Sequence, residues 1–135
     1  MAGAGAGKVA LVTGGGSGIG RAAALALQED GWNVAICGRR KDELAKTVGM
    51  AKAGGGKMLA VSADITKAAE VKKVFAELKA AFGRLDLAFN NAGAGAPPVP
   101  MEDLPLEKWQ SVVDLNLTAC FMCAQEAIRM FKAQT

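Results

Sequence analysis

Apolar residues occur along the chain in four short runs, separated by longer segments with a helical period. The runs predict strands over residues 8–13, 33–38, 57–63 and 84–90, and the first two resemble strands buried on both faces. Between them apolar positions recur every three or four residues, which predicts helices over 18–30, 41–52, about 66–82 and 106–132. Thr66 is expected to cap the third of these helices.

This alternation predicts an α/β fold. It is typical of a doubly wound parallel sheet of the Rossmann type, with right-handed crossovers and strand order 3-2-1-4. In that order the fourth strand forms an unpaired edge, so we expect residues 8–135 to be a Rossmann domain that is incomplete at its C-terminus. The Gly/Ala-rich residues 1–7 are expected to form a flexible tail.

The composition is that of a globular protein. Of 135 residues, 51% are hydrophobic and 21% are charged, which is enough apolar material for one domain with its own core. A net charge of +3 is too small to indicate a nucleic-acid surface, and no apolar run approaches the roughly 18 residues that cross a membrane. Three cysteines and no histidine suggest neither a disulfide framework nor a metal site, so we expect a reducing, cytoplasmic setting.

Five glycines follow the first strand within residues 14–20, here called the glycine turn. A tight turn from a strand into a helix aims free backbone N–H groups and the helix dipole at one point, which favours a phosphate or pyrophosphate. Side chains at these positions would block the turn and the approach of a ligand. A P-loop is excluded because Arg21 stands where a Lys-Ser/Thr pair is required. A glycine turn without a ligand is the plainer alternative.

The end of the second strand distinguishes between nicotinamide cofactors. An acid there would bind a ribose 2′-hydroxyl, but this chain has Gly38, Arg39 and Arg40. A guanidinium can pair with a 2′-phosphate, which a carboxylate would repel. The sequence therefore favours NADP over NAD. The alternative is that both arginines only decorate a helix that faces solvent.

Four motifs together resemble the short-chain dehydrogenase/reductase family. They are Thr-Gly-Gly-Gly-Ser-Gly-Ile-Gly at 13–20, Asp64 in SADIT, Asn-Asn-Ala-Gly at 90–93 and Asn116 in VVDLNLT. The resemblance covers the whole chain after the tail, but only the first part of the family's fold. It implies an oxidoreductase that transfers hydride between a nicotinamide and a carbonyl or alcohol substrate.

The resemblance also implies roles for individual residues. Asp64 would bind the adenine amino group with Ile65 beside it, although alone it would read as a carboxylate at a helix start. The stretch 90–93 would close over the adenine ribose, although alone it is merely a turn signal. The implied cofactor-binding set is Gly14, Gly16, Ser17, Gly18, Ile19, Gly20, Arg39, Arg40, Asp64, Ile65, Asn90, Asn91, Ala92 and Gly93.

Asn116 falls within an apolar stripe of the last predicted helix and is therefore expected to be buried. The stripe comprises Trp109, Val112, Val113, Leu117, Cys120, Phe121, Ala124 and Ile128. A buried amide needs partners, and a core asparagine bonded to nearby backbone is the plain interpretation. The resemblance implies a catalytic role instead, in which Asn116 holds a water that links the catalytic lysine to solvent. It also implies that this region packs subunits into a homotetramer or homodimer, with core packing as the alternative.

The chain contains no tyrosine, whereas the family's reaction uses a Tyr, a Lys four residues later and a Ser. We therefore expect the 135 residues alone to bind cofactor without catalysis. A non-catalytic dinucleotide-binding protein or a truncated fragment remains an alternative. A methyltransferase is a further alternative, although the arginine pair argues against it because a methyl donor carries no phosphate.

Overall fold

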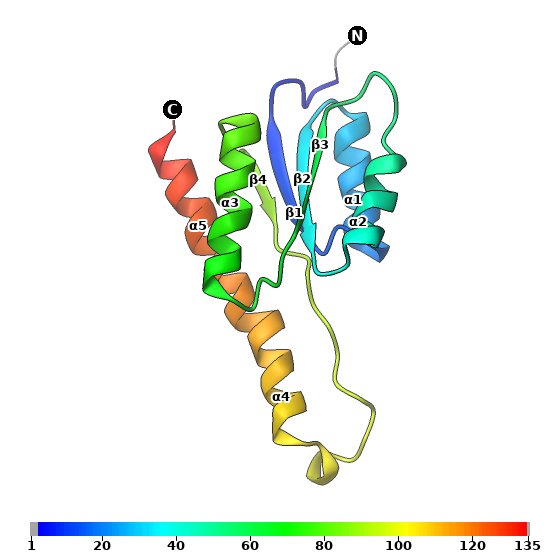
Figure 1. Ribbon diagram of the computed structural model, residues 1–135, viewed down its shortest axis with the longest axis vertical. Coiled ribbons are helices and arrows are strands. Elements are labelled where there is room, and N and C mark those ends of the chain that lie inside the picture. The colour runs from blue at the N-terminus through cyan, green and yellow to red at the C-terminus, as the bar shows by residue number, and fades with distance from the viewer. Residues whose placement is uncertain (1–2, 135) are drawn as a thin grey trace.

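The computed structural model describes residues 3–134 and contains one parallel sheet. Its strands are β1 (Val9–Thr13), β2 (Asn33–Gly38), β3 (Met58–Ser62) and β4 (Leu87–Phe89). They lie in the order β3-β2-β1-β4, which confirms the predicted topology (Figure 1). In the register Thr13 is opposite Cys37, so β1 and β2 end side by side. This places the two sequence segments with candidate chemistry at one edge of the sheet.

Helices cover both faces of the sheet (Figure 1). On one side lie α1 (Gly18–Glu29) and α2 (Lys41–Gly49), and on the other α3 (Ala68–Phe82) and α5 (Ala119–Ala133). Side chains of a strand alternate between faces, so Val12 and Ile36 pack with Ala24 of α1 and Leu44 of α2. Their neighbours, among them Leu11 and Cys37, pack with α3 and α5. The continuous apolar runs of β1 and β2 thus reflect burial on both faces, whereas the edge strands β3 and β4 are half-buried or exposed at most positions.

The last predicted helix is interrupted. It consists of α4 (Leu106–Val113), a π-helical segment (Asp114–Thr118) and α5. The predicted buried stripe is wrong on both sides of the interruption: Trp109 of α4, and Leu117, Phe121 and Ile128 in and just before α5, are more than half exposed. The buried residues of α5 are instead Ala119, Cys123 and Ala127. A π segment inserts an extra residue into the turn, which rotates the helix after it by roughly 100° relative to the one before.

Asn116 lies in this π-helical segment and is exposed, so its predicted burial is also wrong. It nevertheless has the backbone partners that the sequence required. Its Nδ2 donates to the carbonyl oxygens of Ala94 (2.8 Å) and Val112 (2.9 Å). The amide therefore ties the loop after β4 to the end of α4.

Three smaller differences concern element boundaries. The fourth strand is only Leu87–Phe89, and a 3₁₀ turn (Met101–Asp103) lies in the loop that follows it. Helix α3 starts at Ala68 after Lys67, so Thr66 is not its cap. The hydroxyl and N–H of Thr66 donate to Asp64 instead, because a carboxylate two residues earlier is within reach of both and is a strong acceptor.

Residues 3–7 of the predicted tail form turns, and Gly5 N–H donates to the carbonyl of Asp30 at 3.2 Å. Residues 1 and 2 lie outside the described residues. Within 3–134, no helix is long and apolar enough to cross a membrane. In the same range no three His, Cys, Asp or Glu side chains are grouped as a metal would require.

Candidate functional site

A cavity of about 960 Å³ lies at the carboxyl ends of the strands. This is the edge at which ligands bind in open α/β sheets, and the volume lies at the upper end of the range for small-molecule sites. The glycine turn, the end of β2, the segment after β3 and the segment after β4 all contribute to its wall. The fold therefore brings together four motifs that are far apart in the sequence.

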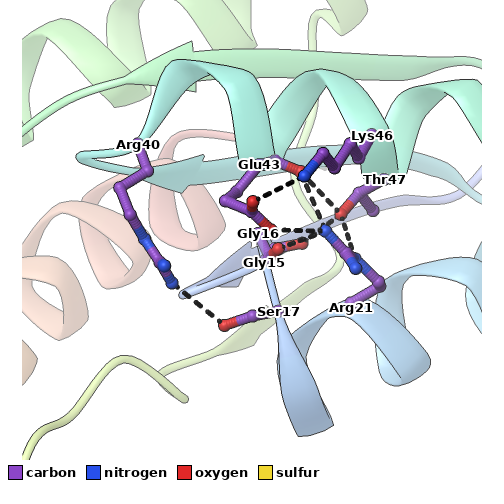
Figure 2. A network of polar contacts seen from close by, with 8 residues as sticks. All are labelled: Gly15, Gly16, Ser17, Arg21, Arg40, Glu43, Lys46 and Thr47. Atoms are coloured by element: carbon purple, nitrogen blue, oxygen red, sulfur yellow. Dashed lines mark hydrogen bonds and ion pairs between the residues drawn. The ribbon is translucent and has the colours of Figure 1, made fainter.

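The glycine turn is held from behind by the end of β2 and by α2. The N–H groups of Gly14 and Gly15 donate to the carbonyl of Cys37, at 2.9 and 3.3 Å. The carbonyl of Gly15 accepts from Thr47 Oγ1 at 2.8 Å, and that of Gly16 accepts from Arg21 Nη2. Figure 2 shows these contacts of Thr47 and Arg21 converging on the turn.

The direction of these carbonyls fixes the direction of the next amides. All described peptide bonds are trans, so each N–H points opposite the preceding carbonyl. The N–H groups of Gly16 and Ser17 therefore point away from Thr47 and Arg21. Neither has a hydrogen-bond acceptor within residues 3–134. Together with the first turn of α1 they offer free donors to an anion.

Several positions in the turn require glycine, and Gly14 and Gly20 illustrate the two reasons. Gly14 has φ +68°, a backbone conformation that side chains disfavour. At Gly20 a Cβ would overlap the carbonyl of Gly14 and would reach within 2.6 Å of Asn91 Nδ2. The start of α1 thus lies directly against the end of β1.

Arg39 and Arg40 lie on the cavity wall immediately after β2. Arg40 precedes α2 and its Nη2 lies 3.4 Å from Ser17 Oγ, as Figure 2 shows. The two arginines and the glycine turn therefore share one end of the cavity. The sequence alone predicted that the arginines lie near the glycine turn only because other doubly wound folds place the ends of these two strands side by side.

Asp64 and Ile65 line the cavity after β3. Asp64 Oδ1 accepts from the hydroxyl (2.6 Å) and N–H (3.1 Å) of Thr66, while Oδ2 has no hydrogen-bond partner among residues 3–134. Thr66, and to a lesser extent Lys67 and Arg39, hold the pKa of the Asp64 carboxyl below its usual range. Asp64 therefore presents one free, ionised oxygen at the cavity.

The segment after β4 is tied to the end of β1. Asn91 Nδ2 donates to the carbonyl of Thr13 at 3.1 Å, and Ala92 N–H donates to Thr13 Oγ1 at 2.9 Å. Asn91, Ala92 and Gly93 line the cavity. The neighbouring Asn90 does not, but its buried Oδ1 has no hydrogen-bond partner in the described part of the chain.

Most of the predicted site residues meet in this cavity, and three do not line it: Gly20, Asn90 and Asn116. Gly20 lies behind the turn. Asn116 lies next to the cavity, because its Nδ2 donates to the carbonyl of Ala94, which lines it. Four kinds of contribution were not predicted from the sequence. Thr13 supplies a hydroxyl at the strand end, Arg21 and Thr47 brace the turn, Glu43 lines the wall, and α4 and the π-helical segment add Lys108, Ser111, Val112, Asp114 and Leu115.

Solved structures support this arrangement. An NAD+-bound xylitol dehydrogenase superposes with a TM-score of 0.92 at 30% identity, over 97% of this chain and 50% of that one. A 3-ketoacyl-(acyl-carrier-protein) reductase from Brucella melitensis, complexed with NADH, gives 0.88 at 34% identity, over 95% and 51% of the two chains.

Sequence comparison agrees. A 3beta-hydroxysteroid dehydrogenase of Mediterraneibacter gnavus is 37% identical over 125 residues, which are 93% of this chain and 45% of that protein. This chain thus spans about half the length of these relatives. The family model described as short chain dehydrogenase matches residues 8–135, which sets aside the methyltransferase alternative. The cavity, the sheet order and the comparisons lead to one conclusion: the chain belongs to the short-chain dehydrogenase family.

Proposed function

We propose that this chain is the cofactor-binding part of an NADP-dependent oxidoreductase that transfers hydride between nicotinamide and a carbonyl or alcohol substrate. The observation that carries this proposal is the placement of Arg39 and Arg40 on the same cavity as the glycine turn. A dinucleotide with a 2′-phosphate needs both features in one site. The two solved relatives described above hold NAD+ or NADH, so the preference for NADP rests on the arginines of this chain.

The chain's groups fit the cofactor from its pyrophosphate to its adenine. The free N–H groups of Gly16 and Ser17, with Gly18 and Ile19 in the first turn of α1, would bind the pyrophosphate. Gly14 and Gly20 would keep the turn compact. Arg39 would pair with the 2′-phosphate, and Arg40 would support it from the side of Ser17.

The other cavity wall would hold adenosine. The free oxygen of Asp64 is suited to accept from the adenine amino group, with Ile65 against the ring. Asn91, Ala92 and Gly93 would enclose the ribose from the cavity wall, and Asn90 would support this segment from behind, since it does not line the cavity.

When bound, the nicotinamide supplies or accepts the hydride. This chain would position it through the cavity wall and would contribute Asn116 to the movement of the proton. Nδ2 of Asn116 is committed to Ala94 and Val112, so its Oδ1 is the atom available to hold a water. We also propose that the enzyme acts in the cytoplasm. We further propose that it forms a homodimer or homotetramer, and the exposed apolar residues Leu117, Phe121 and Ile128 support this second proposal.

Titration calorimetry of the purified protein with NADPH and NADH tests the proposal. We expect NADPH to bind at least about tenfold more tightly, and Arg39→Ala to remove most of that difference while leaving NADH affinity unchanged. Arg129→Ala, an exposed arginine on α5 paired with Glu126, is the matched control and should change neither affinity. Equal affinities in the unmodified protein would refute the NADP preference. Binding of neither nucleotide would refute the oxidoreductase proposal.

A further inference from the structure

A carboxylate lies on the cavity wall close to the proposed 2′-phosphate site. Glu43 lines the cavity together with Arg39 and Arg40, and it belongs to the first turn of α2. Its Cβ is so close to the glycine turn that a Cβ added at Gly16 would lie 3.2 Å from it. A carboxylate beside a 2′-phosphate is repulsive, and it is the group by which other doubly wound proteins select NAD.

Two cations neutralise this carboxylate. Arg21 Nη2 lies 3.1 Å from Glu43 Oε2, and Lys46 Nζ lies 2.9 Å from Oε1 (Figure 2). Lys46, and after it Arg21, hold the pKa of the Glu43 carboxyl below its usual range, so the group remains ionised. The side chain of Lys46 is 61% exposed, whereas that of Arg21 is 22% exposed and is fixed by three further hydrogen bonds. Arg21 is therefore the less screened and better ordered of the two counter-charges.

Arg21 does not line the cavity itself, so it has to act through Glu43. On the basis of the proposed NADP preference, we propose that Arg21 is a positioning residue for cofactor specificity. It neutralises Glu43 and turns the carboxylate toward α1, so that the wall beside Arg39 and Arg40 accepts a 2′-phosphate. Without Arg21 the same carboxylate would favour a cofactor that lacks this phosphate.

Arg21 also bonds the carbonyl of Gly16, and its Nε donates to Thr47 Oγ1 at 2.9 Å. Removal of the Arg21 side chain should therefore lower the affinity for both NADPH and NADH, because it loosens the glycine turn. The ratio of the two affinities separates the electrostatic role from this bracing role, because bracing of the pyrophosphate turn affects NADPH and NADH alike.

The test is calorimetric titration of the purified protein and three variants with NADPH and NADH. Arg21→Gln should lower NADPH affinity about fivefold more than NADH affinity, since it leaves a charge with one exposed partner near the phosphate. Adding Glu43→Gln to that variant should restore the ratio of the unmodified protein, even where both affinities stay low. Lys52→Gln is the matched control. Lys52 Nζ lies 2.9 Å from Glu29 Oε1, and neither residue lines the cavity, so the ratio of NADPH to NADH affinity should not change in this variant.

Equal losses for both cofactors in Arg21→Gln, or no restoration by Glu43→Gln, would overturn the inference. The proposed function is judged separately, from the ratio in the unmodified protein. If that protein binds NADH as tightly as NADPH, the NADP preference fails, whereas the shift of the ratio between the variants still decides whether Arg21 shields the 2′-phosphate from Glu43.

Discussion

The most direct test of the glycine turn is the substitution Gly20→Ala. A Cβ at this position would overlap the carbonyl oxygen and carbon of Gly14 and would lie 2.6 Å from Asn91 Nδ2. Real Cβ atoms essentially never approach other atoms within 3.0 Å, so the end of β1 or the start of α1 has to move. Such overpacking costs about 1–3 kcal/mol. If the cost falls on the conformation that binds the cofactor, affinity should fall about 5- to 150-fold.

Gly49→Ala is the matched control for this substitution. Gly49 is the last residue of α2, has no positive φ, and has no atoms within 4 Å of an added Cβ. Alanine there should leave cofactor affinity unchanged and should raise the free energy of unfolding by as much as about 1 kcal/mol, since glycine is the poorer helix former. Urea denaturation and calorimetry measure both quantities. If Gly20→Ala matched Gly49→Ala in stability and bound NADPH within about twofold of the unmodified protein, the close approach of α1 to β1 would be refuted.

Two further predictions follow from ionisable groups in the core and at the sheet edge. Arg84 holds the pKa of Asp86 below its usual range, and Asp86 Oδ2 accepts from Val9 N–H at 2.9 Å. Above the pKa of an unfolded aspartate, which is about 4, the charged carboxylate should therefore raise the free energy of unfolding by about 1 kcal/mol relative to Asp86→Asn, as urea denaturation would measure. This difference between the two proteins should disappear as the pH falls through the lowered pKa of the folded state. A difference that grew in acid would contradict the prediction. Burial raises the pKa of the Cys37 thiol to about 12. Iodoacetamide at about pH 8 should therefore modify the exposed Cys120 at least about a hundredfold faster than Cys37, as mass spectrometry of timed samples would show. Comparable rates at the two cysteines would refute the burial of Cys37.

Much of the fold is visible in the sequence because it depends on local patterns. The runs at β1 and β2 are apolar at every interior position, since both faces of those strands are covered, and the structure confirms them. The glycine turn is equally local, because it is a backbone requirement that only glycine meets at Gly14 and Gly20. The order of the strands is not local in this way: other doubly wound sheets share the alternation of elements with a different order, so 3-2-1-4 was predicted from the Rossmann type of fold, and the structure confirms it.

The last helix shows where periodicity fails. Its sequence offers two apolar faces, one of large residues such as Phe121 and Ile128 and one of small residues such as Ala119 and Ala127. The helix buries the face of small residues, which lets α5 lie close to α3. Apolar residues recur at helical spacing on both faces, so the spacing alone cannot show which face is buried. The π-helical segment then shifts the phase within the run, so residues on either side of it do not share one face.

The network behind the glycine turn was missed for a different reason. Arg21, Glu43 and Thr47 come from two helices that meet only in the folded chain, and no spacing within either helix marks them. One signal was available: Arg21 is the first charged residue of α1 and lies in its first turn, where the helix macrodipole disfavours a cation. A cation at the start of a helix needs a compensating partner, and α2 provides both the Glu43 carboxylate and the Thr47 hydroxyl. Local patterns therefore predict where a cofactor can bind, whereas the charge that would select the cofactor depends on contacts between elements.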